Sequence, residues 1–441
     1  MLSNGETVET KLQRIAEKAR QDPRCKFTSL FHLMDVDLLR GCFARLRRDA
    51  AAGIDQVTKE EYQANLEENL RILVDKIHRM AYRPLPVRRV YIPKLGSNKQ
   101  RPLGIPAIED KLVQAGLARL LTAIYEQDFI ADSYGFRPGR SCHDALRSLS
   151  HEVERKPVNH IVGVDIKGFF DNVEHKWLMQ FLAHRVADKR VLRYTERFLK
   201  AGIMEDGALL DQGDEGTPQG GIISPILANI YLHYTLDLWF ERKFRKSCWG
   251  NARLIRYADD WVTCFQRGDE AVRFRCEVEE RLAQFGLEVS PEKTKVLEFG
   301  PMAEARAKRC GGKPHTFDFL GFTHYCSRAR GSRRFRMKRI TSRKKFTAKL
   351  RAFKEWLKAS RTLPARELMA KVVSKIQGHF AYYGVTDNSP GLLRFSIAVR
   401  RLLFKWLNRR GKRDCMKWDK FRSFLGKFPL PKPIIRVHLL T

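Results

Sequence analysis

The chain has 441 residues, 43% of them hydrophobic, and a formal net charge of +33. This length and composition allow a buried core and two or more domains, which argues against general disorder. The sequence has no apolar run near the roughly 20 residues that span a bilayer, no signal-peptide pattern at its start, and nine cysteines without a Cys-x-x-Cys pair, which argues against a disulfide framework and a zinc module. We therefore expect a reduced, cytoplasmic protein.

The positive charge lies mainly in the last third of the chain. Residues 301–441 hold 36 Lys+Arg against 7 Asp+Glu, an excess of 29 out of the total of 33. Such a charge predicts a polyanionic partner, most simply a nucleic acid. An anionic membrane surface is the alternative, and it predicts binding to liposomes without RNA. The chain thus divides near residue 300 into a nearly neutral part and a strongly basic part.

The first elements of the chain are expected to be helices. Residues 1–50 have apolar residues interspersed among charges, as in helices. Thr58 and Glu61 have the spacing of a capping box, which predicts a helix from there to about Met80.

Two strand-like runs, 87–94 and 101–106, predict a β-hairpin with Lys94 and Arg101 at the ends of its loop. Paired cations there could hold a triphosphate, Arg101 by bidentate hydrogen bonds and Lys94 as a point charge. Taken alone, the hairpin is more simply explained as a basic loop in solvent.

A loop at 134–141 follows an amphipathic helix that is expected over 108–129. The loop combines glycines and aromatic residues with Arg137 and Arg140, a composition typical of a place where a nucleic-acid backbone approaches. We assign no chemistry to His143, because such a histidine is more often a surface or capping residue.

Two acidic segments predict a divalent-metal site. Asp165 lies in the apolar strand 162–166, where burial would make its charge costly without a cation or hydrogen bonds. Asp259 and Asp260 lie between two apolar, β-prone runs, which predicts a strand, a tight turn and a second strand. Adjacent carboxylates repel each other unless something positive lies between them, and Mg²⁺ typically takes one or two carboxylates plus substrate phosphates. Without the Asp165 strand, an Asp-Asp pair would be read as a solvated turn.

A glycine-rich loop opens the next expected helix. Residues 216–225 lead into a helix to about Trp239, and Gln219 is the only long polar side chain in the glycine-rich start. The helix N-terminus behind it would favour a phosphate, although a plain Gly-Pro loop is the alternative.

The last part of the chain predicts short strands and then basic helices. Strand 296–299 follows a helix at 269–285, and the segment 317–323 pairs aromatic residues with a glycine. Three basic amphipathic helices are expected at about 346–357, 366–380 and 392–408, forming a bundle with a phosphate-binding face.

Six motifs in a fixed order resemble those of bacterial group II intron reverse transcriptases, also called maturases. They are Arg-Pro-Leu-Gly-Ile-Pro at 101–106, Tyr-Gly-Phe-Arg-Pro-Gly-Arg-Ser at 134–141, the Asp165 strand, Gly-Thr-Pro-Gln-Gly at 216–220, Tyr-Ala-Asp-Asp at 257–260, and Phe-Leu-Gly-Phe at 319–322. The resemblance extends from about Phe27 to at least Asn408. Each motif alone is weak evidence, but six in order are specific.

The resemblance implies an α+β fold of the right-hand polymerase type. An N-terminal extension and fingers, with some palm segments, would occupy residues 1–160. The palm, an antiparallel sheet backed by helices and including some fingers segments, would occupy 161–335. The α-helical thumb, called domain X, would span 336–410, and a short basic DNA-binding tail 411–441. The sequence stops without the zinc-containing endonuclease of many family members, so we expect it to use a primer cut by another agent.

The resemblance also implies a metal site. Two Mg²⁺ ions, for which Mn²⁺ could substitute, would be held by Asp165, Asp259, Asp260 and the backbone carbonyl of Ile166. They would lower the pKa of a primer 3′-hydroxyl and stabilise the leaving pyrophosphate.

The nucleotide and primer positions follow from the same resemblance. Lys94 and Arg101 would clamp the triphosphate, Gln219 and Gly220 would lie beside the incoming nucleotide, and Phe170 would exclude a ribonucleotide 2′-hydroxyl. The expected primer or template contacts are Arg137, Arg140, Tyr257, Lys293, Lys295, Phe319, Leu320, Gly321 and Phe322. For the two lysines, an ordinary place on the surface is an equally good interpretation.

The function implied is that of an RNA-directed DNA polymerase that copies RNA into cDNA and assists the splicing and mobility of a group II intron. Its partners would be an RNA template, a DNA or RNA primer, the intron RNA, a DNA target and deoxynucleotides, with no membrane, in a bacterial cytoplasm and associated with RNA or the nucleoid. The alternatives are a polymerase of the same fold recruited to host repair or antiviral defence, a non-catalytic splicing chaperone, and a DNA-templated polymerase. The complete set of three acids argues against the chaperone, and the motif order argues against a DNA template.

Overall fold

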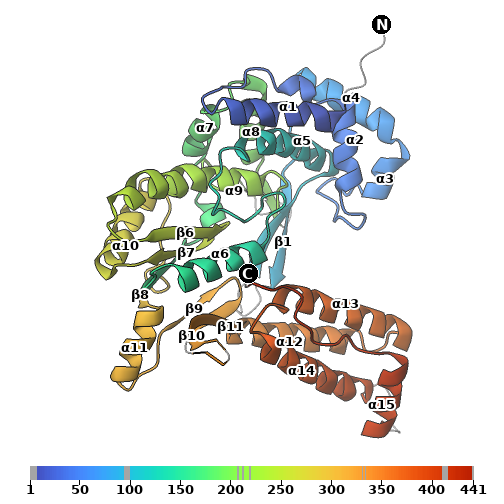
Figure 1. The fold of residues 1–441 in the computed structure, drawn as a ribbon. Helices are drawn as coiled ribbons and strands as arrows, with labels where there is room; N and C mark the ends of the chain where they lie inside the picture. Colours follow the sequence, from blue (N-terminus) through green and yellow to red (C-terminus); the bar gives the residue numbers. More distant parts are fainter. Residues whose placement is uncertain are drawn as a thin grey trace.

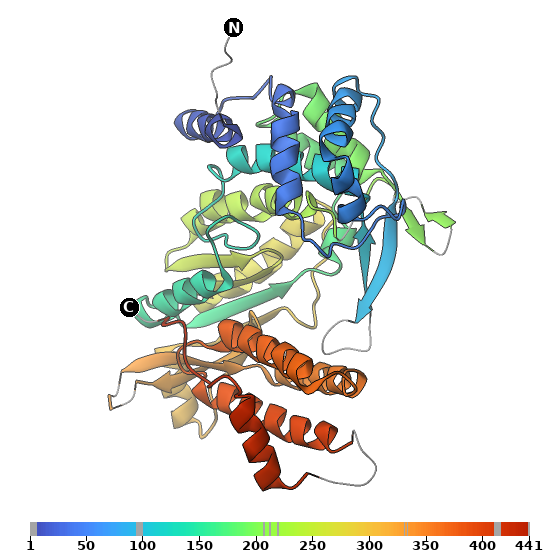
Figure 2. The same cartoon turned by 90° about the vertical axis from the view of Figure 1, so that its right-hand side faces the viewer.

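The computed structural model describes residues 7–93, 100–205, 208–210, 213–217, 220–329, 331–332, 334–409 and 416–439. Helices of the first 130 residues form one end of the molecule, a layer of strands and helices forms the middle, and helices of the last 100 residues form the other end (Figures 1 and 2). The predicted mixed α+β class is confirmed, and most strand pairs are antiparallel. None of the helices in the described residues is both long and apolar enough to cross a bilayer.

The N-terminal end is helical. Its helices are α1 (Val8–Gln21), α2 (Val36–Arg45), α3 (Lys59–Ala64), α4 (Leu66–His78) and α5 (Ile108–Tyr125). The capping box of Thr58 and Glu61 is present and starts α3. The expectation of one helix to Met80 is wrong, because Asn65 leaves the helical conformation with φ −124° and ψ 39° and separates α3 from α4.

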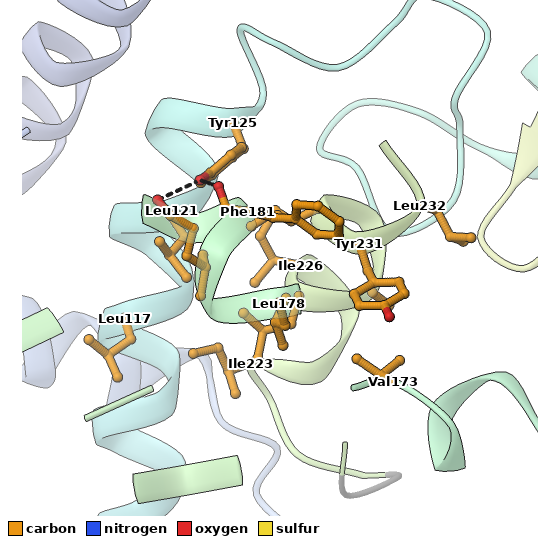
Figure 3. Close-up of a cluster of buried hydrophobic side chains, with 14 of the residues drawn as sticks. Leu117, Leu121, Tyr125, Val173, Leu178, Phe181, Ile223, Ile226, Tyr231 and Leu232 are labelled. Carbon is orange, nitrogen blue, oxygen red and sulfur yellow. Dashed lines mark hydrogen bonds between the residues drawn. The ribbon is translucent and has the colours of Figure 1, made fainter. Parts of the chain in front are cut away.

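The α5 helix is the centre of the largest apolar core. It packs against α1, α2, α8 (Lys189–Leu199) and α9 (Ser224–Leu232), and its C-terminal end meets α7 (His175–Ala183). In the close-up of this core, side chains of α5, α7 and α9 point toward one another (Figure 3). The hydroxyl of Tyr125, at the end of α5, donates to the backbone carbonyls of Phe181 and Leu182 at 3.1 Å each. This buried polar group is therefore satisfied where α5 meets α7.

The expected hairpin is β1 (Val87–Pro93) and β2 (Gln100–Ile105), and its pairing is antiparallel. The β1 strand also pairs in parallel with β4 (Ile203–Glu205), which pairs with β5 (Ala208–Leu210). The hairpin projects from the N-terminal end toward the C-terminal helices (Figure 2).

The middle layer contains an antiparallel sheet in the order β6 (Ala252–Tyr257), β7 (Asp260–Phe265), β3 (His160–Asp165) and β8 (Lys295–Glu298). Its two faces are buried against different partners. Val162 and Trp261 face the core that contains α9 and α10 (Gly268–Ala283). Ile161 and Val262 face the core that contains α6 (Cys142–Arg155). Burial of both faces explains why these strands are almost continuously apolar.

Short non-α turns lie between some of these helices and strands. They are the 3₁₀ turns Phe31–Leu33, Phe169–Asp171 and Arg245–Ser247, and the π-helical turns His233–Asp237 and Phe240–Phe244, which continue α9.

The basic part of the chain begins with α11 (Pro301–Arg309) and a sheet of β9 (Thr316–Phe319), β10 (Phe322–Arg328) and β11 (Phe335–Thr341). The expected basic helices are α12 (Arg343–Ala359), α13 (Ala365–Tyr383) and α14 (Ser389–Leu407), and α15 (Trp418–Lys427) joins them. These helices share a separate apolar core. The chain then returns to the middle layer, where Val437 pairs with Val385.

Candidate active site

The two predicted acidic segments are neighbours in one sheet. Asp165 is the last residue of β3 and lies directly opposite Asp260, the first residue of β7. The carbonyl of Asp165 accepts a hydrogen bond from the backbone N–H of Ser290 at 2.8 Å, on the edge of β3 away from β7. The pair with Asp260 is therefore a non-hydrogen-bonded pair, in which Cα atoms lie about 4.5 Å apart. Two like charges directly opposite each other destabilise a sheet, so this position favours a cation.

The Asp165 side chain is balanced by a lysine. Its carboxylate accepts a hydrogen bond from Lys293 Nζ at 2.6 Å, and the side chain is 46% exposed. The expectation that Asp165 is buried is wrong, because the residue ends its strand and its side chain reaches solvent. Lys293, expected near the primer, thus lies within the acidic site.

The other two carboxyl groups have raised pKa values. Asp260 is an exposed residue, but its carboxyl group lies close to many protein atoms. This loss of hydration, together with the charges of Asp259 and Asp165, raises the pKa of Asp260 to about 7, while a backbone hydrogen bond from Leu320 acts in the opposite direction. Burial also raises the pKa of Asp259, and the charge of Arg101 opposes that shift. Without a further cation, the ionised forms of these carboxyl groups are therefore unfavourable.

A buried ion pair holds the turn that carries Asp259. Arg256 donates to both carboxylate oxygens of Asp237, at 2.8 and 2.5 Å, and both side chains are fully buried. Its Nη1 also donates to the Asn229 side chain and to the carbonyl of Ala258, both at 3.0 Å. Ala258 has a φ of +57°, which is uncommon for a residue other than glycine. The guanidinium thus fixes a turn residue in an unfavourable conformation next to Asp259.

Gly135 supports the same turn from the other side. A Cβ atom at Gly135 would lie 2.2 Å from the backbone nitrogen of Ala258, so the two backbones are in contact. The carbonyl of Gly135 accepts a hydrogen bond from the Asn229 side chain at 2.7 Å, and Tyr134 N–H donates to the carbonyl of Arg256 at 2.8 Å. The loop 134–141 is therefore part of the support of the acidic turn.

The expected nucleotide residues that the structure describes lie close to one another. The backbone N–H of Thr217 donates to the carbonyl of Phe170 at 2.7 Å. A Cβ atom at Gly220 would lie 2.4 Å from the carbonyl oxygen of Gly104 in β2. Thr217 thus lies against Phe170, and Gly220 lies against the strand that carries Arg101. Lys94 and Gln219 lie outside the described residues.

The carbonyl of Ile166 points toward β7, and its role as a metal ligand stays a prediction. The residues before and after it are hydrogen-bonded to the segment 288–290, by Ser290 N–H to the Asp165 carbonyl and by Lys167 N–H to the Glu288 carbonyl, each at 2.8 Å. Ile166 is therefore the non-hydrogen-bonded residue of this pairing, and its carbonyl points to the opposite edge of the strand, where β7 lies.

The Phe-Leu-Gly-Phe motif meets the acidic site through its turn. Leu320 and Gly321 have φ values of +49° and +79° and connect β9 to β10. The Tyr382 hydroxyl donates to the Leu320 carbonyl at 3.0 Å. The rings of Phe319 and Phe322 are buried in the core, so the predicted primer contact of these two side chains is corrected: only the turn between them can reach a primer.

The expectation for Arg137 is also corrected. Its side chain is buried, pairs with Glu126 at 2.7 Å, and donates to the carbonyls of Ile130 and Ser133. Its hydrogen bonds go to residues between 126 and 133, just before the loop, so Arg137 has a structural role. Arg140 is half-buried, donates to the carbonyl of Ala131 and lies over the ring of Tyr134.

The remaining two expected contacts keep accessible surface. Tyr257 is half-buried at the end of β6, and Lys295 is exposed at the start of β8. Their roles stay predictions.

Sequence reasoning missed Arg256, Asp237, Asn229 and Gly135 as part of the site. The position of Arg256 in an apolar strand was one sign of a buried ion pair, because a buried charge requires a partner. The identity of that partner was not readable from spacing, since Asp237 lies on a π-helical turn of another element.

Comparisons with known proteins agree with this geometry. The sequence profile of the family described as "Reverse transcriptase (RNA-dependent DNA polymerase)" matches residues 92–324, just over half of the chain. This chain belongs to the reverse transcriptase family. The matched range contains all three acids, so the acidic site lies in the part that defines the family. RNA-directed DNA polymerisation is the activity of this family, and the resemblance noted from the six motifs is confirmed.

Three relatives show how far the similarity extends. This reverse transcriptase is 33% identical over 299 residues to Protein YkfC of Escherichia coli strain K12, covering 60% of this chain and 78% of that protein. It is 37% identical over 223 residues to the group II intron-encoded protein LtrA of Lactococcus lactis subsp. cremoris, covering 50% of this chain and 37% of LtrA. It is 45% identical over 156 residues to an uncharacterized 91 kDa protein in the cob intron of Schizosaccharomyces pombe, covering 35% of this chain and 19% of that protein. The chain thus spans little more than a third of LtrA.

The contact of Gly135 with the acidic turn predicts the effect of one methyl group. Gly135→Ala forces the backbone of Ala258 to move. Small displacements of reacting groups cost up to about 100-fold in rate. We therefore expect the nucleotide incorporation rate to fall by at least about tenfold. Affinity for template–primer should change less than about threefold. Gly378→Ala, on α13 with no atom within 4 Å of the added methyl group and without a positive φ, is the control. Single-turnover extension checks this, and equal rates for the two variants would contradict it.

Proposed function

We propose that the chain is the RNA-directed DNA polymerase of a group II intron, copying RNA into cDNA by two-metal nucleotidyl transfer, and that it assists splicing and mobility by binding the intron RNA. The observation that carries the proposal is the cross-strand pair of Asp165 and Asp260 beside Asp259, within the region that matches the reverse transcriptase family. The similarity to LtrA, named as a group II intron-encoded protein, supports the intron assignment.

The fold supports a right-hand arrangement. The N-terminal helices and the β1–β2 hairpin correspond to the fingers in residues 1–160, and the sheet of β6, β7, β3 and β8 to the palm in 161–335. Helices α12 to α14 correspond to the thumb in 336–410, and α15 lies in the proposed DNA-binding tail, 411–441.

The acidic site fits a divalent metal that binds together with substrate. Among the described residues, no three His, Cys, Asp or Glu side chains converge closely enough to hold a metal ion by themselves. Mg²⁺ usually completes its coordination with water and substrate phosphates. The opposed carboxylates of Asp165 and Asp260, and the raised pKa values of Asp259 and Asp260, favour a cation. Asp165, Asp259, Asp260 and the Ile166 carbonyl would hold it. When bound, Mg²⁺ supplies Lewis-acid activation of the primer hydroxyl and of the leaving group.

The chain's own residues orient the nucleotide. Arg101 is exposed on β2, close enough to Asp259 to affect its pKa, and so can bind a triphosphate at the acidic site. Lys94 and Gln219 are proposed to assist it. Phe170 is fixed by the Thr217 hydrogen bond to its carbonyl and by edge contact with the Phe169 ring at 5.2 Å. A fixed ring at this position would exclude a 2′-hydroxyl.

The basic helices are proposed to bind RNA. The excess of 29 positive charges in residues 301–441 supports binding of intron RNA and of template and primer, because neutralising phosphates releases counterions. Lys293, Lys295, Tyr257, Arg140 and the Leu320–Gly321 turn are proposed to contact the primer or template.

Primer extension on an RNA template with deoxynucleotides and Mg²⁺ tests the function. Replacing both Asp259 and Asp260 by alanine should reduce extension at least about 1,000-fold, since metal activation contributes several kcal/mol. Asp269→Ala with Asp419→Ala, two exposed acids, should extend normally. Tight RNA binding without extension by the wild type would favour the splicing chaperone, and extension by the Asp259 and Asp260 variant would mean that the metal site lies elsewhere.

The Phe170 ring predicts sugar selectivity. Phe170→Ala removes the group proposed to lie against the 2′ position, so incorporation of ribonucleotides relative to deoxynucleotides should rise about tenfold or more. Phe428→Ala, which shortens another half-buried phenylalanine, should leave selectivity unchanged. Competition between the two nucleotide types in single-turnover extension measures the ratio, and an unchanged ratio in Phe170→Ala would refute this role.

The raised pKa of Asp260 predicts competition between protons and metal. Below pH 7 the carboxyl group is mostly protonated in the metal-free protein, with about a tenfold excess of the protonated form at pH 6. Since a ligand must lose its proton to bind metal, the Mg²⁺ concentration for half-maximal extension should rise about fivefold from pH 7 to pH 6 and only about twofold from pH 8 to pH 7. Mg²⁺ titrations at the three pH values test this, and a constant half-maximal concentration would contradict it.

A further inference from the structure

One tryptophan far from the acidic site is almost completely exposed. Trp249 has 94% of its side chain accessible, the highest value among the large apolar side chains of the described residues. Single exposed apolar residues are common and do not by themselves indicate a site. Two further observations distinguish Trp249: the turn that carries it is fixed, and the chain segment that leads into it is basic.

The turn is held by a buried acid. The backbone N–H groups of Trp249 and Gly250 both donate to one carboxylate oxygen of Glu270, at 2.6 and 3.0 Å, and Glu270 is buried at the start of α10. Asn251 N–H donates to the Gln266 side chain at 3.0 Å, and Gln266 N–H returns a hydrogen bond to the Asn251 carbonyl at 2.8 Å. The backbone is thus fixed while the indole stays free. Because the backbone of the turn is already fixed, stacking of a ligand on the indole would cost little backbone conformational entropy.

The segment that carries Trp249 is positively charged. The segment 241–251 holds four basic residues and one acidic residue. Within the described part of the chain, exposed Arg242, Lys243 and Lys246 form no ion pair, whereas Arg245 pairs with Glu241. We call Trp249 with these three unpaired cations the Trp249 patch.

The Trp249 patch is separate from the acidic site. Trp249 precedes β6 at Ala252, whereas the acidic turn follows the other end of β6, at Tyr257. At a rise of about 3.3 Å per residue, β6 alone puts about 16 Å between these ends. Figure 1 shows α10, which holds the turn through Glu270, at the edge of the molecule on the side away from β1.

We propose that the Trp249 patch binds single-stranded nucleic acid outside the polymerase site, with an unpaired base stacked on the indole and neighbouring phosphates held by the three cations. Every base has a π-face and every nucleotide a negative phosphate, so a fixed, exposed indole among unpaired cations matches this ligand class. The binding is tolerant of sequence, because stacking does not read base edges. This proposal does not depend on the polymerase chemistry.

Photo-cross-linking of the full chain tests the proposal. The polymerase site is first filled with a short template–primer duplex, and single-stranded oligonucleotides carrying 5-iodouridine, as RNA and as DNA of one sequence, are then added and irradiated. Peptide mapping should find a cross-link at Trp249. Trp249→Ala should abolish it and weaken binding of the second oligonucleotide about 5- to 100-fold, in line with the stacking of one base. Cross-linking of either nucleic acid supports the proposal, and the two arms show which one is preferred.

A matched control and a second readout keep the test decisive. Val272→Ala shortens another exposed apolar side chain, 54% accessible, on α10, and it should retain the cross-link and the affinity. Extension of a short template–primer should be unchanged in both variants, which shows that they are folded. Absence of a cross-link at Trp249 together with equal affinities would overturn the proposal. So would a wild-type dimer that Trp249→Ala dissociates, because a second copy of the chain would then cover the patch.

Discussion

The acidic site depends on the register of β3 against β7. Side chains alternate between the faces of a strand, so a shift of one residue would move Asp165 to the opposite face of the sheet. Burial on both faces prevents such a shift, because Ile161 and Val262 pack into one core while Val162 and Trp261 pack into the other. The apolar pattern that forms the strands therefore also determines where the two opposed carboxylates lie.

The second requirement is support for the turn behind those carboxylates. The turn is held by a guanidinium from its own strand, by the backbone of the loop that contains Gly135, and through Asn229 by helix α9. None of these groups is expected to touch a substrate. They fix the position of the Asp259 carboxylate through contacts from three separate segments, so the geometry of the site depends on the core beneath it.

Local sequence patterns predicted most helices and strands, but they did not predict which distant residues pack against them. The capping box at Thr58 is formed as expected, because it involves only neighbouring residues. The break at Asn65, the exposure of Asp165 and the burial of Arg137 were not predicted, since each depends on how a segment packs against distant ones. Asp237 illustrates the limit: its sequence position on a helix gives no sign that it neutralises an arginine in the sheet. The acids of the site were identified because they form part of ordered motifs, whereas the residues that position them do not.

The buried pair of Arg256 and Asp237 has a consequence for how this chain can change over time. Removing either partner alone leaves an unpaired charge in the core, which typically costs about 3–5 kcal/mol. Lysine cannot reproduce the fork that binds both oxygens and also reaches the Ala258 carbonyl. Single substitutions at either position should therefore be eliminated by selection. Descendants of this sequence would keep both residues or replace both together, so the two positions should co-vary.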